Sequence, residues 1–225
     1  MTPATRPPVA GGDTLLLATR SAGKLRELAS LCDEAGIAWQ SLASLGVPED
    51  ADAEEAVECH DTFQANARAK AAWYRERSGA LWVLAEDSGL CVDALGGAPG
   101  VQSKRWGGAA TERGGALEAA NIARVQTALA SVGAETAAAR RAAYVCVAVV
   151  QGPDGLTFEG EGRTAGHLLR APRGSGGFGY DPIFWSDELG AAFGEVSASA
   201  KAAVSHRGRA VRAAVGSLKD FLGTR

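Results

Sequence analysis

Residues 14–24 read TLLLATRSAGK, and this stretch determines how the fold begins. Residues 14–19 are an apolar run of strand length, and the polar, glycine-containing residues 20–23 are typical of a turn. After the turn, apolar side chains recur at helical spacing at Leu25, Leu28, Leu31 and Cys32. Ser21 is suited to cap this helix and Gly36 to end it. The chain is therefore expected to open as strand, turn and helix.

The same alternation continues along the chain. Further strands are expected at 37–42, 81–85 and 90–95, and helices at 62–77, at 118–132 and after Ser205. Residues 142–150 and 156–163 are predicted to pair as a hairpin across the turn GPDG. Loops are expected at 49–61, which contains seven acids and no Lys or Arg, at 96–108 and at 170–184. This order predicts an α/β fold with a mixed β-sheet.

The composition indicates a globular protein that binds no nucleic acid. Of its 225 residues, 46% are hydrophobic and 22% are charged, so the chain can bury a core and is not a disordered protein. A net charge of -3 is too balanced for a protein that binds duplexes by neutralising phosphates. The four cysteines form no CxxC pair, so reduced thiols are expected instead of a structural zinc site.

Residues 1–12 contain three prolines and no long apolar run, so neither a signal peptide nor a membrane anchor is expected there. These residues are predicted to be a disordered leader, and 13–225 to be a single domain of two lobes. The chain is expected to be cytoplasmic and to have no membrane partner.

Two turns are candidate sites, because ligands of α/β sheets bind where strands end. Gly23 permits close backbone approach before a helix N-terminus, and Arg20 and Lys24 add positive charge, which suits a phosphate. Ala18 replaces the first glycine that a Walker A loop needs. Ordinary solvated charges remain an alternative explanation for this turn.

Glu86 and Asp87 are adjacent carboxylates at the expected end of the strand 81–85. Successive strand side chains point to opposite faces, so only one of the two is expected to face a cleft. A carboxylate there could bind Mg²⁺ and accept a proton from an attacking water. A solvated acidic turn is the alternative.

Two later segments are suited to a nucleobase. Phe178 and Tyr180 lie among glycines in GGFGYDPIF, where a ring could stack on a base or could simply pack in the core. His206 and Arg207 follow Ser205 at a helix start, where their donors could bind a purine carbonyl. A purely structural histidine is the alternative for His206.

Together, LLLATRSAGKLREL, FQANARAKA, AEDSGLCVDALGGAPGVQSKRW, GGFGYDPIF and KAAVSHRG resemble the inosine triphosphate pyrophosphatase family over almost the whole chain. The resemblance implies an elongated, two-lobed mixed α/β fold with a central nucleotide-binding cleft, and a homodimer. It implies Mg²⁺-dependent hydrolysis of non-standard purine triphosphates such as ITP, dITP, XTP and dXTP to the monophosphate and pyrophosphate.

The resemblance also implies roles for individual residues. Asp87 would be the catalytic proton acceptor and a metal ligand. The triphosphate would bind to Thr19, Arg20, Ser21, Ala22, Gly23 and Lys24. Further substrate contacts would come from Ser88, Phe178, Gly179, Tyr180, Asp181, Lys201, His206 and Arg207.

The chain departs from the family pattern at three positions. The motif TFxENAxxKA has Ala65 where the family has a metal-binding Glu. Glu86 or Asp61 could take its place, and Asp61 would share a helical face with Ala65 if residues 61–65 are helical. Ser21 stands where Asn is common, and Ala200 where an acid is common.

The sequence is also compatible with three alternative functions. The missing Glu allows a nucleotide-binding protein with impaired hydrolysis. A Maf-like nucleotide pyrophosphatase, acting on pyrimidine or modified triphosphates, is a second alternative. A phosphotransferase is disfavoured by the missing Walker A pattern.

Overall fold

The computed structural model describes residues 14–79, 82–108 and 114–224. The expected leader at 1–12, and Leu81 at the expected start of a strand, lie outside these residues. Within the described residues, no helix is long and apolar enough to cross a membrane.

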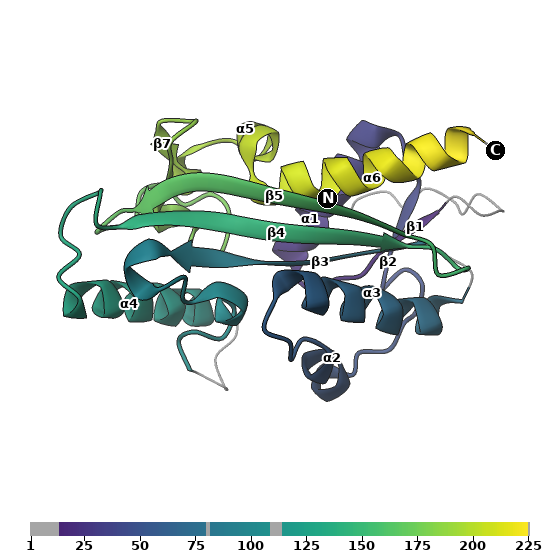
Figure 1. The fold of residues 1–225 in the computed structure, drawn as a ribbon, viewed down its shortest axis with the longest axis horizontal. Helices are drawn as coiled ribbons and strands as arrows, with labels where there is room; N and C mark the ends of the chain where they lie inside the picture. Colours follow the sequence, from purple (N-terminus) through teal and green to yellow (C-terminus); the bar gives the residue numbers. More distant parts are fainter. Residues whose placement is uncertain (1–13, 80–81, 109–113, 225) are drawn as a thin grey trace.

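One mixed sheet of seven strands forms the centre of the described structure, in the order β2-β1-β3-β4-β5-β6-β7 (Figure 1). The strands are β1 (Leu15–Leu17), β2 (Trp39–Ser41), β3 (Trp82–Val92), β4 (Arg141–Gln151), β5 (Thr157–Leu168), β6 (Phe184–Ser186) and β7 (Ala191–Ala192). Strand β1 pairs in parallel with β2 and β3, and the other pairs are antiparallel. The predicted mixed sheet and the β4–β5 hairpin are confirmed.

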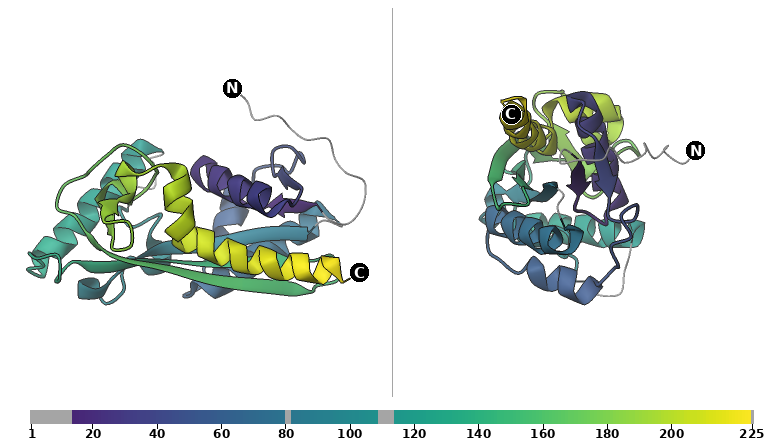
Figure 2. Two further views of the ribbon diagram at one scale, coloured as in Figure 1. Left: turned by 90° about the horizontal axis from the view of Figure 1, so that it is seen from above. Right: turned by 90° about the vertical axis from the view of Figure 1, so that its right-hand side faces the viewer.

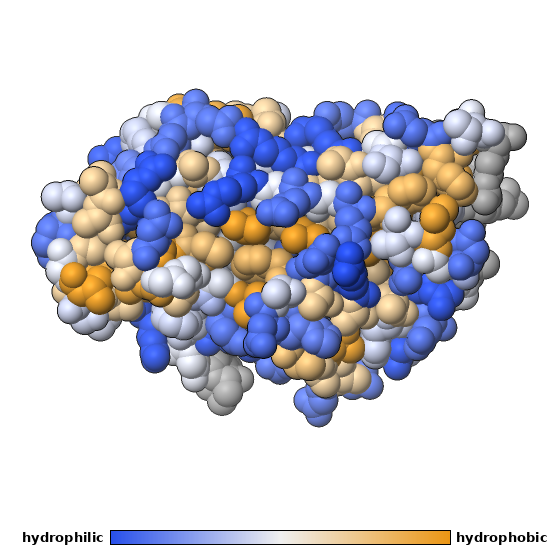
Figure 3. All heavy atoms as spheres, viewed as in Figure 1, coloured by the Kyte–Doolittle hydropathy of each residue, from blue (hydrophilic) through white to orange (hydrophobic). Residues whose placement is uncertain are grey.

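Helices lie on both sides of this sheet, and the molecule is elongated along β3, β4 and β5 (Figures 1 and 2). The α-helices are α1 (Ala22–Ala35), α2 (Ala51–Val57), α3 (Phe63–Ser78), α4 (Gly115–Ser131), α5 (Ala198–Val204) and α6 (His206–Gly223). Short 3-10 helices are η1 (Asp93–Leu95), η2 (Gly100–Gln102), η3 (Asp181–Ile183) and η4 (Phe193–Glu195). In Figure 3, hydrophilic and apolar residues are interspersed over one face, and several apolar residues lie near its centre.

Three apolar clusters hold these layers together. Helices α1 and α6 pack on Leu15, Leu17 and Leu84, whereas α3 packs on the opposite face of the same strands. The third cluster, at the other end of the sheet, joins α4 to β3, β4 and β6. Burial of these side chains is the main favourable contribution to folding. The sheet is therefore packed between α1 and α6 on one face and α3 on the other.

The first helix forms as predicted. The Ser21 hydroxyl accepts a hydrogen bond from the Lys24 amide at 3.4 Å, and Gly36 ends the helix with a φ of 71°. This φ is one that glycine adopts at no steric cost. Ser205 caps α6 in the same way, accepting from the Gly208 amide at 3.0 Å. Local sequence signals were sufficient to locate both helix starts.

The predicted polar turn at 86–89 is wrong, because β3 runs unbroken from Trp82 to Val92. Glu86 pairs with Ala148 and Gly89 pairs with Val145, so the backbone of this stretch forms ladder bonds with β4. The separate strand expected at 90–95 is also wrong, because residues 90–92 are the end of β3 and residues 93–95 form the 3-10 helix η1. Polar side chains are accommodated inside the strand because partners elsewhere in the chain bind them.

The acidic loop expected at 49–61 is also wrong in part, because residues 51–57 form helix α2. The Asp50 carboxylate caps this helix by accepting from the Ala53 amide at 3.1 Å. Asp52 and Glu54 lie in its first turn, where negative charge interacts favourably with the helix dipole. The acidity of the segment is therefore a helix-start signal.

Helix α6 approaches β5 so closely that only glycine fits at the contact. A Cβ atom at Gly162 would lie 2.0 Å from the His206 carbonyl oxygen, and one at Gly160 would lie 2.1 Å from that of Ala210. The backbones of β5 and α6 are therefore in direct contact, which fixes the position of the helix start that carries His206.

We expect Gly162→Ala to lower the free energy of unfolding by about 1–3 kcal/mol, because the added methyl must displace backbone. Gly216→Ala, in helix α6, is the control, since nothing lies within 4 Å of its Cβ position. That control should be neutral or stabilising by up to about 1 kcal/mol. Urea denaturation of both variants checks this, and equal stabilities would contradict the close packing.

Candidate active site

The site lies beside an open stretch of β3. Strand β1 pairs with β3 only as far as Leu84, and the Ala18 amide makes the last contact, with the Leu84 carbonyl at 2.8 Å. Beyond this point β3 continues without β1, and the turn into α1 lies next to it. Both faces of β3 can therefore contribute side chains to one site.

Glu86 is the buried carboxylate that faces α1 and α6. Lys24 Nζ lies 2.7 Å from Glu86 Oε1, and Arg207 Nε lies 3.5 Å from Oε2. Burial alone would raise the pKa of Glu86, but Lys24 and Arg207 outweigh this effect and hold the pKa well below its ordinary range. Glu86 is therefore a charged structural partner of two cations.

Asp87 faces the opposite side of β3, toward α3. Its Oδ2 accepts from Asn66 Nδ2 at 2.9 Å, and its Oδ1 accepts from the Ser88 amide at 3.0 Å. Burial raises the pKa of Asp87, and Lys24 and Lys70 oppose that shift. Glu86 and Asp87 do point to opposite faces as predicted, but both are buried, and only Asp87 lacks a salt bridge among the described residues.

A second buried network joins the segments that the sequence singled out near the C-terminus. Lys201 Nζ lies 2.8 Å from a Glu27 oxygen and 2.5 Å from Asp181 Oδ2. Arg207 contacts the other Glu27 oxygen and donates to the Ser88 hydroxyl at 2.8 Å. Glu27 thus joins Lys201 to Arg207. These two cations in turn contact Asp181 and Ser88.

The sequence interpretation missed Glu27, although a signal was present. Glu27 lies three residues after Lys24, so both side chains project from the same face of α1. Burial raises the pKa of Glu27, but Arg207 and Lys201 outweigh it and lower the pKa below its ordinary value of 4.5. Glu27 is therefore the anion that balances two buried cations.

One aromatic side chain, that of Phe178, lies next to these cations. The Phe178 ring packs on the first turn of α1, where a Cβ at Gly23 would lie 2.7 Å from it. Lys201 Nζ is 4.8 Å and the Arg207 guanidinium 5.5 Å from the centre of this ring. The glycine at position 23 thus permits close approach of the Phe178 ring.

His206 and Tyr180 are more deeply placed. Each is less than 5% exposed, and the Tyr180 hydroxyl donates to the Ser103 carbonyl at 2.8 Å. Gly179 between Phe178 and Tyr180 has a φ of 64°, which lets the loop turn sharply. Tyr180 therefore fixes this loop from within the core.

Additional cations that the sequence interpretation did not single out line the site next to Asp87. Lys70 Nζ donates to the Glu86 carbonyl at 3.1 Å and contacts the Glu58 carboxylate. Burial lowers the pKa of Lys104, and nearby Lys24 and Lys70 lower it further against the opposing effect of Glu58. Lys70 lies four residues after Asn66, so both side chains project from the same face of α3. This spacing was the signal in the sequence that could have identified Lys70. Lysines from several segments therefore converge on the carboxylates of Glu58, Glu86 and Asp87.

Two predicted residues lie apart from these groups. The Arg20 guanidinium binds Glu54 of α2 at 2.9 Å, together with the Val47 and Pro48 carbonyls, so it fastens α2 to the turn. Asp61 is exposed and precedes Thr62, the cap of α3, so the expected shared helical face with Ala65 is wrong. Within the described residues, no group of three or more His, Cys, Asp or Glu side chains is placed to bind a metal.

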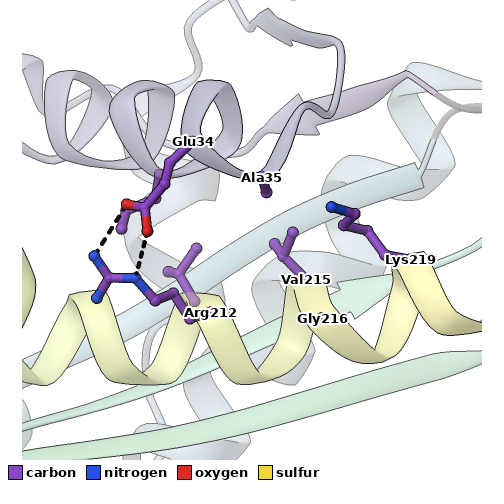
Figure 4. A pocket seen from close by; sticks show the side chains of 8 residues that line it. Glu34, Ala35, Arg212, Val215, Gly216 and Lys219 are labelled. Atoms are coloured by element: carbon purple, nitrogen blue, oxygen red, sulfur yellow. Dashed lines mark hydrogen bonds and ion pairs between the residues drawn. The ribbon is translucent and has the colours of Figure 1, made fainter.

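A groove of about 190 Å³ between α1 and α6 is separate from this site (Figure 4). Its floor includes Ala35, Val215 and Gly216, and the ion pair between Glu34 and Arg212 crosses one end. It contains none of the predicted catalytic groups.

The Ham1 family model matches residues 15–216 of the chain. The chain belongs to the Ham1 family. It is 42% identical over 198 residues to a Zymomonas mobilis protein named dITP/XTP pyrophosphatase, covering 88% of each chain. A Geobacter sulfurreducens protein of the same name is 43% identical, covering 93% of this chain and 96% of the relative.

The fold of this Ham1 family member matches solved structures as well. A HAM1 protein from Coxiella burnetii superposes with a TM-score of 0.72 and 30% identity, covering 94% of this chain and 99% of the other. The family resemblance and the mixed α/β fold expected from the sequence are confirmed.

In this Ham1 family protein, we expect Glu27→Gln to lower the free energy of unfolding at pH 7 by about 3 kcal/mol, since it leaves buried cations unbalanced. The Glu27 pKa is depressed on folding, so its stabilising contribution is complete above pH 4.5 and is lost as pH falls through the lower, folded-state pKa. The difference between variant and parent should therefore shrink in acid. Denaturant titrations at neutral and acidic pH measure it.

Glu34→Gln is the matched control, because it removes an exposed ion pair with Arg212 from the same helix. Its effect should stay below about 1 kcal/mol. Equal losses for the two variants would show that Glu27 is no more important than a surface acid.

Proposed function

We propose that this chain is a nucleoside triphosphate pyrophosphatase that hydrolyses non-standard purine nucleotides, ITP, dITP, XTP and dXTP, to the monophosphate and pyrophosphate. The observation that carries the proposal is a single carboxylate without a salt bridge, Asp87, beside a cluster of cations on the open stretch of β3. The dITP/XTP pyrophosphatases named above support it.

The cation cluster suits the triphosphate. Lys24, Lys70 and Lys104 surround the carboxylates of Glu58 and Glu86. The positively charged ammonium groups of these lysines would attract phosphate oxygens. The amides of residues 19–24 lie at the N-terminus of α1, which favours negative charge. Substrate binding here therefore needs no Walker A loop.

Asp87 is the group best placed to accept a proton from water. Burial raises its pKa, which makes the carboxylate a stronger base than an exposed aspartate. Its hydrogen bonds from Asn66 and from the Ser88 amide fix its orientation and leave lone pairs on both oxygens. Asp87 would then deprotonate the water that attacks the triphosphate.

The family is metal-dependent, and we propose Mg²⁺ as the ion for this chain. Mg²⁺ commonly takes one or two carboxylates together with substrate phosphates, and Asp87 can provide one. Glu86 is paired with Lys24 and Arg207, Asp61 is exposed outside α3, and Ala65 offers no ligand. When bound, Mg²⁺ would neutralise charge that develops on the phosphate oxygens.

The base would lie between Phe178 and the donors of Arg207 and His206. Hypoxanthine and xanthine carry a carbonyl at C6 that accepts from such donors, whereas adenine presents an amino group. Each buried donor left unpaired costs about 1–3 kcal/mol, so adenine nucleotides would be disfavoured. Guanine carries the same carbonyl, and its exclusion does not follow from these groups.

One alternative keeps support from a specific observation. Ala65 removes a carboxylate that the family uses for metal, which favours a nucleotide-binding protein with weak hydrolysis. The relatives named dITP/XTP pyrophosphatase favour the purine enzyme over the Maf-like alternative. We also propose that the protein acts as a homodimer, which light scattering of the purified chain would test.

We expect Asp87→Asn to reduce turnover of ITP by about a thousandfold or more, since it removes both the proton acceptor and the charged metal ligand. ITP binding should persist, because the lysines and the Phe178 ring remain. Steady-state assays of pyrophosphate release and calorimetric titration with ITP measure the two quantities. Asp154→Asn, in the exposed β4–β5 turn, is the control, and near-normal turnover by Asp87→Asn would refute the mechanism.

We expect Ala65→Glu to lower the Mg²⁺ concentration needed for half-maximal activity, because it adds a carboxylate at the start of α3, next to Asn66, which contacts Asp87. Position 65 is the third residue after the cap Thr62, so Glu would also complete a capping box and stabilise the helix. Ala65→Gln completes the same box without the charge. A Mg²⁺ dependence altered equally by both variants would rule out a metal role for this position.

A further inference from the structure

Tyr144 lies in the interior of the base site, on β4. It pairs with Leu90 of β3 and Thr164 of β5 and is 8% exposed. Its ring packs against Phe184, with ring centres 4.7 Å apart, and stacks on Phe193 at 6.1 Å. These contacts fix the plane of the tyrosine ring independently of any substrate.

The same ring stacks on the imidazole of His206. The two ring centres are 4.5 Å apart and the planes differ by 8°. His206 is 2% exposed, and its Nδ1 has no hydrogen-bond partner among the described residues. A histidine is usually oriented by a hydrogen bond at one ring nitrogen. Here the stack on Tyr144 provides that orientation instead.

The hydroxyl of Tyr144 reaches the other side of the site. It donates to Asp181 Oδ1 at 3.4 Å. The other oxygen, Oδ2, accepts from the Phe178 amide at 2.8 Å and from Lys201 at 2.5 Å. Asp181 thus receives three donors and holds the backbone that carries Phe178. One residue therefore contacts both His206 and the carboxylate that fixes Phe178.

We propose that Tyr144 is a positioning residue of the base site: its ring sets the plane of His206, and its hydroxyl restrains Asp181 and through it Phe178. The inference rests on the proposed function, because it assigns Tyr144 to recognition of the purine and not to binding of the triphosphate. If the ring had only a structural role, its removal would reduce kcat/KM for all substrates equally.

Tyr144→Leu and Tyr144→Phe separate the role of the ring from the role of the hydroxyl. Tyr144→Leu removes the stack and should lower kcat/KM for ITP about tenfold while changing kcat/KM for ATP little, so that selectivity falls. Tyr144→Phe keeps the stack and should lower kcat/KM for ITP only about twofold to fivefold. Phe158→Leu is the control, because Phe158 stacks on Trp82 of β3 away from the site. It should lower stability and leave selectivity unchanged.

A spectroscopic measurement tests the stack without turnover. The chain has three histidines, so proton NMR with His206→Gln as the assignment variant identifies the His206 imidazole signal. The stacked ring should shift that signal upfield in the parent and in Tyr144→Phe, and the shift should be lost in Tyr144→Leu or, if that variant does not fold, in Tyr144→Met. An unchanged His206 signal in the folded variant overturns the inference.

The two proposals fail in different ways. A parent protein that neither binds nor hydrolyses ITP contradicts the proposed function and, with it, the assignment of Tyr144 to purine recognition. A parent that hydrolyses ITP, with Tyr144→Leu reducing ITP and ATP turnover to the same extent, contradicts the Tyr144 inference alone.

Discussion

The structure depends on a buried network of alternating charges that joins segments far apart in the chain. Lys24 and Glu27 of α1, Glu86 of β3, Asp181 of η3, Lys201 of α5 and Arg207 of α6 form it. It contains three cations and three anions, so it is formally neutral. Because each buried charge loses hydration, every member needs its partners in place. The network therefore requires α1, β3 and α6 to meet at one point.

This requirement links folding to recognition. Lys24 and Arg207, which take part in fixing α1 against α6, are the cations that we propose to contact the phosphates and the base. Asp87 stands on the other face of β3, outside the network, with hydrogen bonds but no salt bridge among the described residues. The cations are already oriented before a nucleotide binds, which reduces the cost of ordering them during recognition.

Much of the fold and part of the site could be predicted from local sequence. The turn before α1, the β4–β5 hairpin and the cap of α6 depend on neighbouring residues, so their patterns were readable. Glu86 and Asp87 were misread as a turn because the partners that bury them, Lys24, Arg207 and Asn66, come from distant segments. Glu27 was missed because an acid on an amphipathic helix ordinarily faces solvent. Long-range charge pairing was the information that local patterns lacked.

We infer that this chain hydrolyses a non-standard purine triphosphate between its α- and β-phosphates. The most direct measurement incubates the purified protein with ITP and Mg²⁺, with ATP in parallel, and separates the products by anion exchange. We expect IMP and pyrophosphate from ITP, with little product from ATP. Tight binding of ITP without product, or release of IDP and orthophosphate, would contradict it.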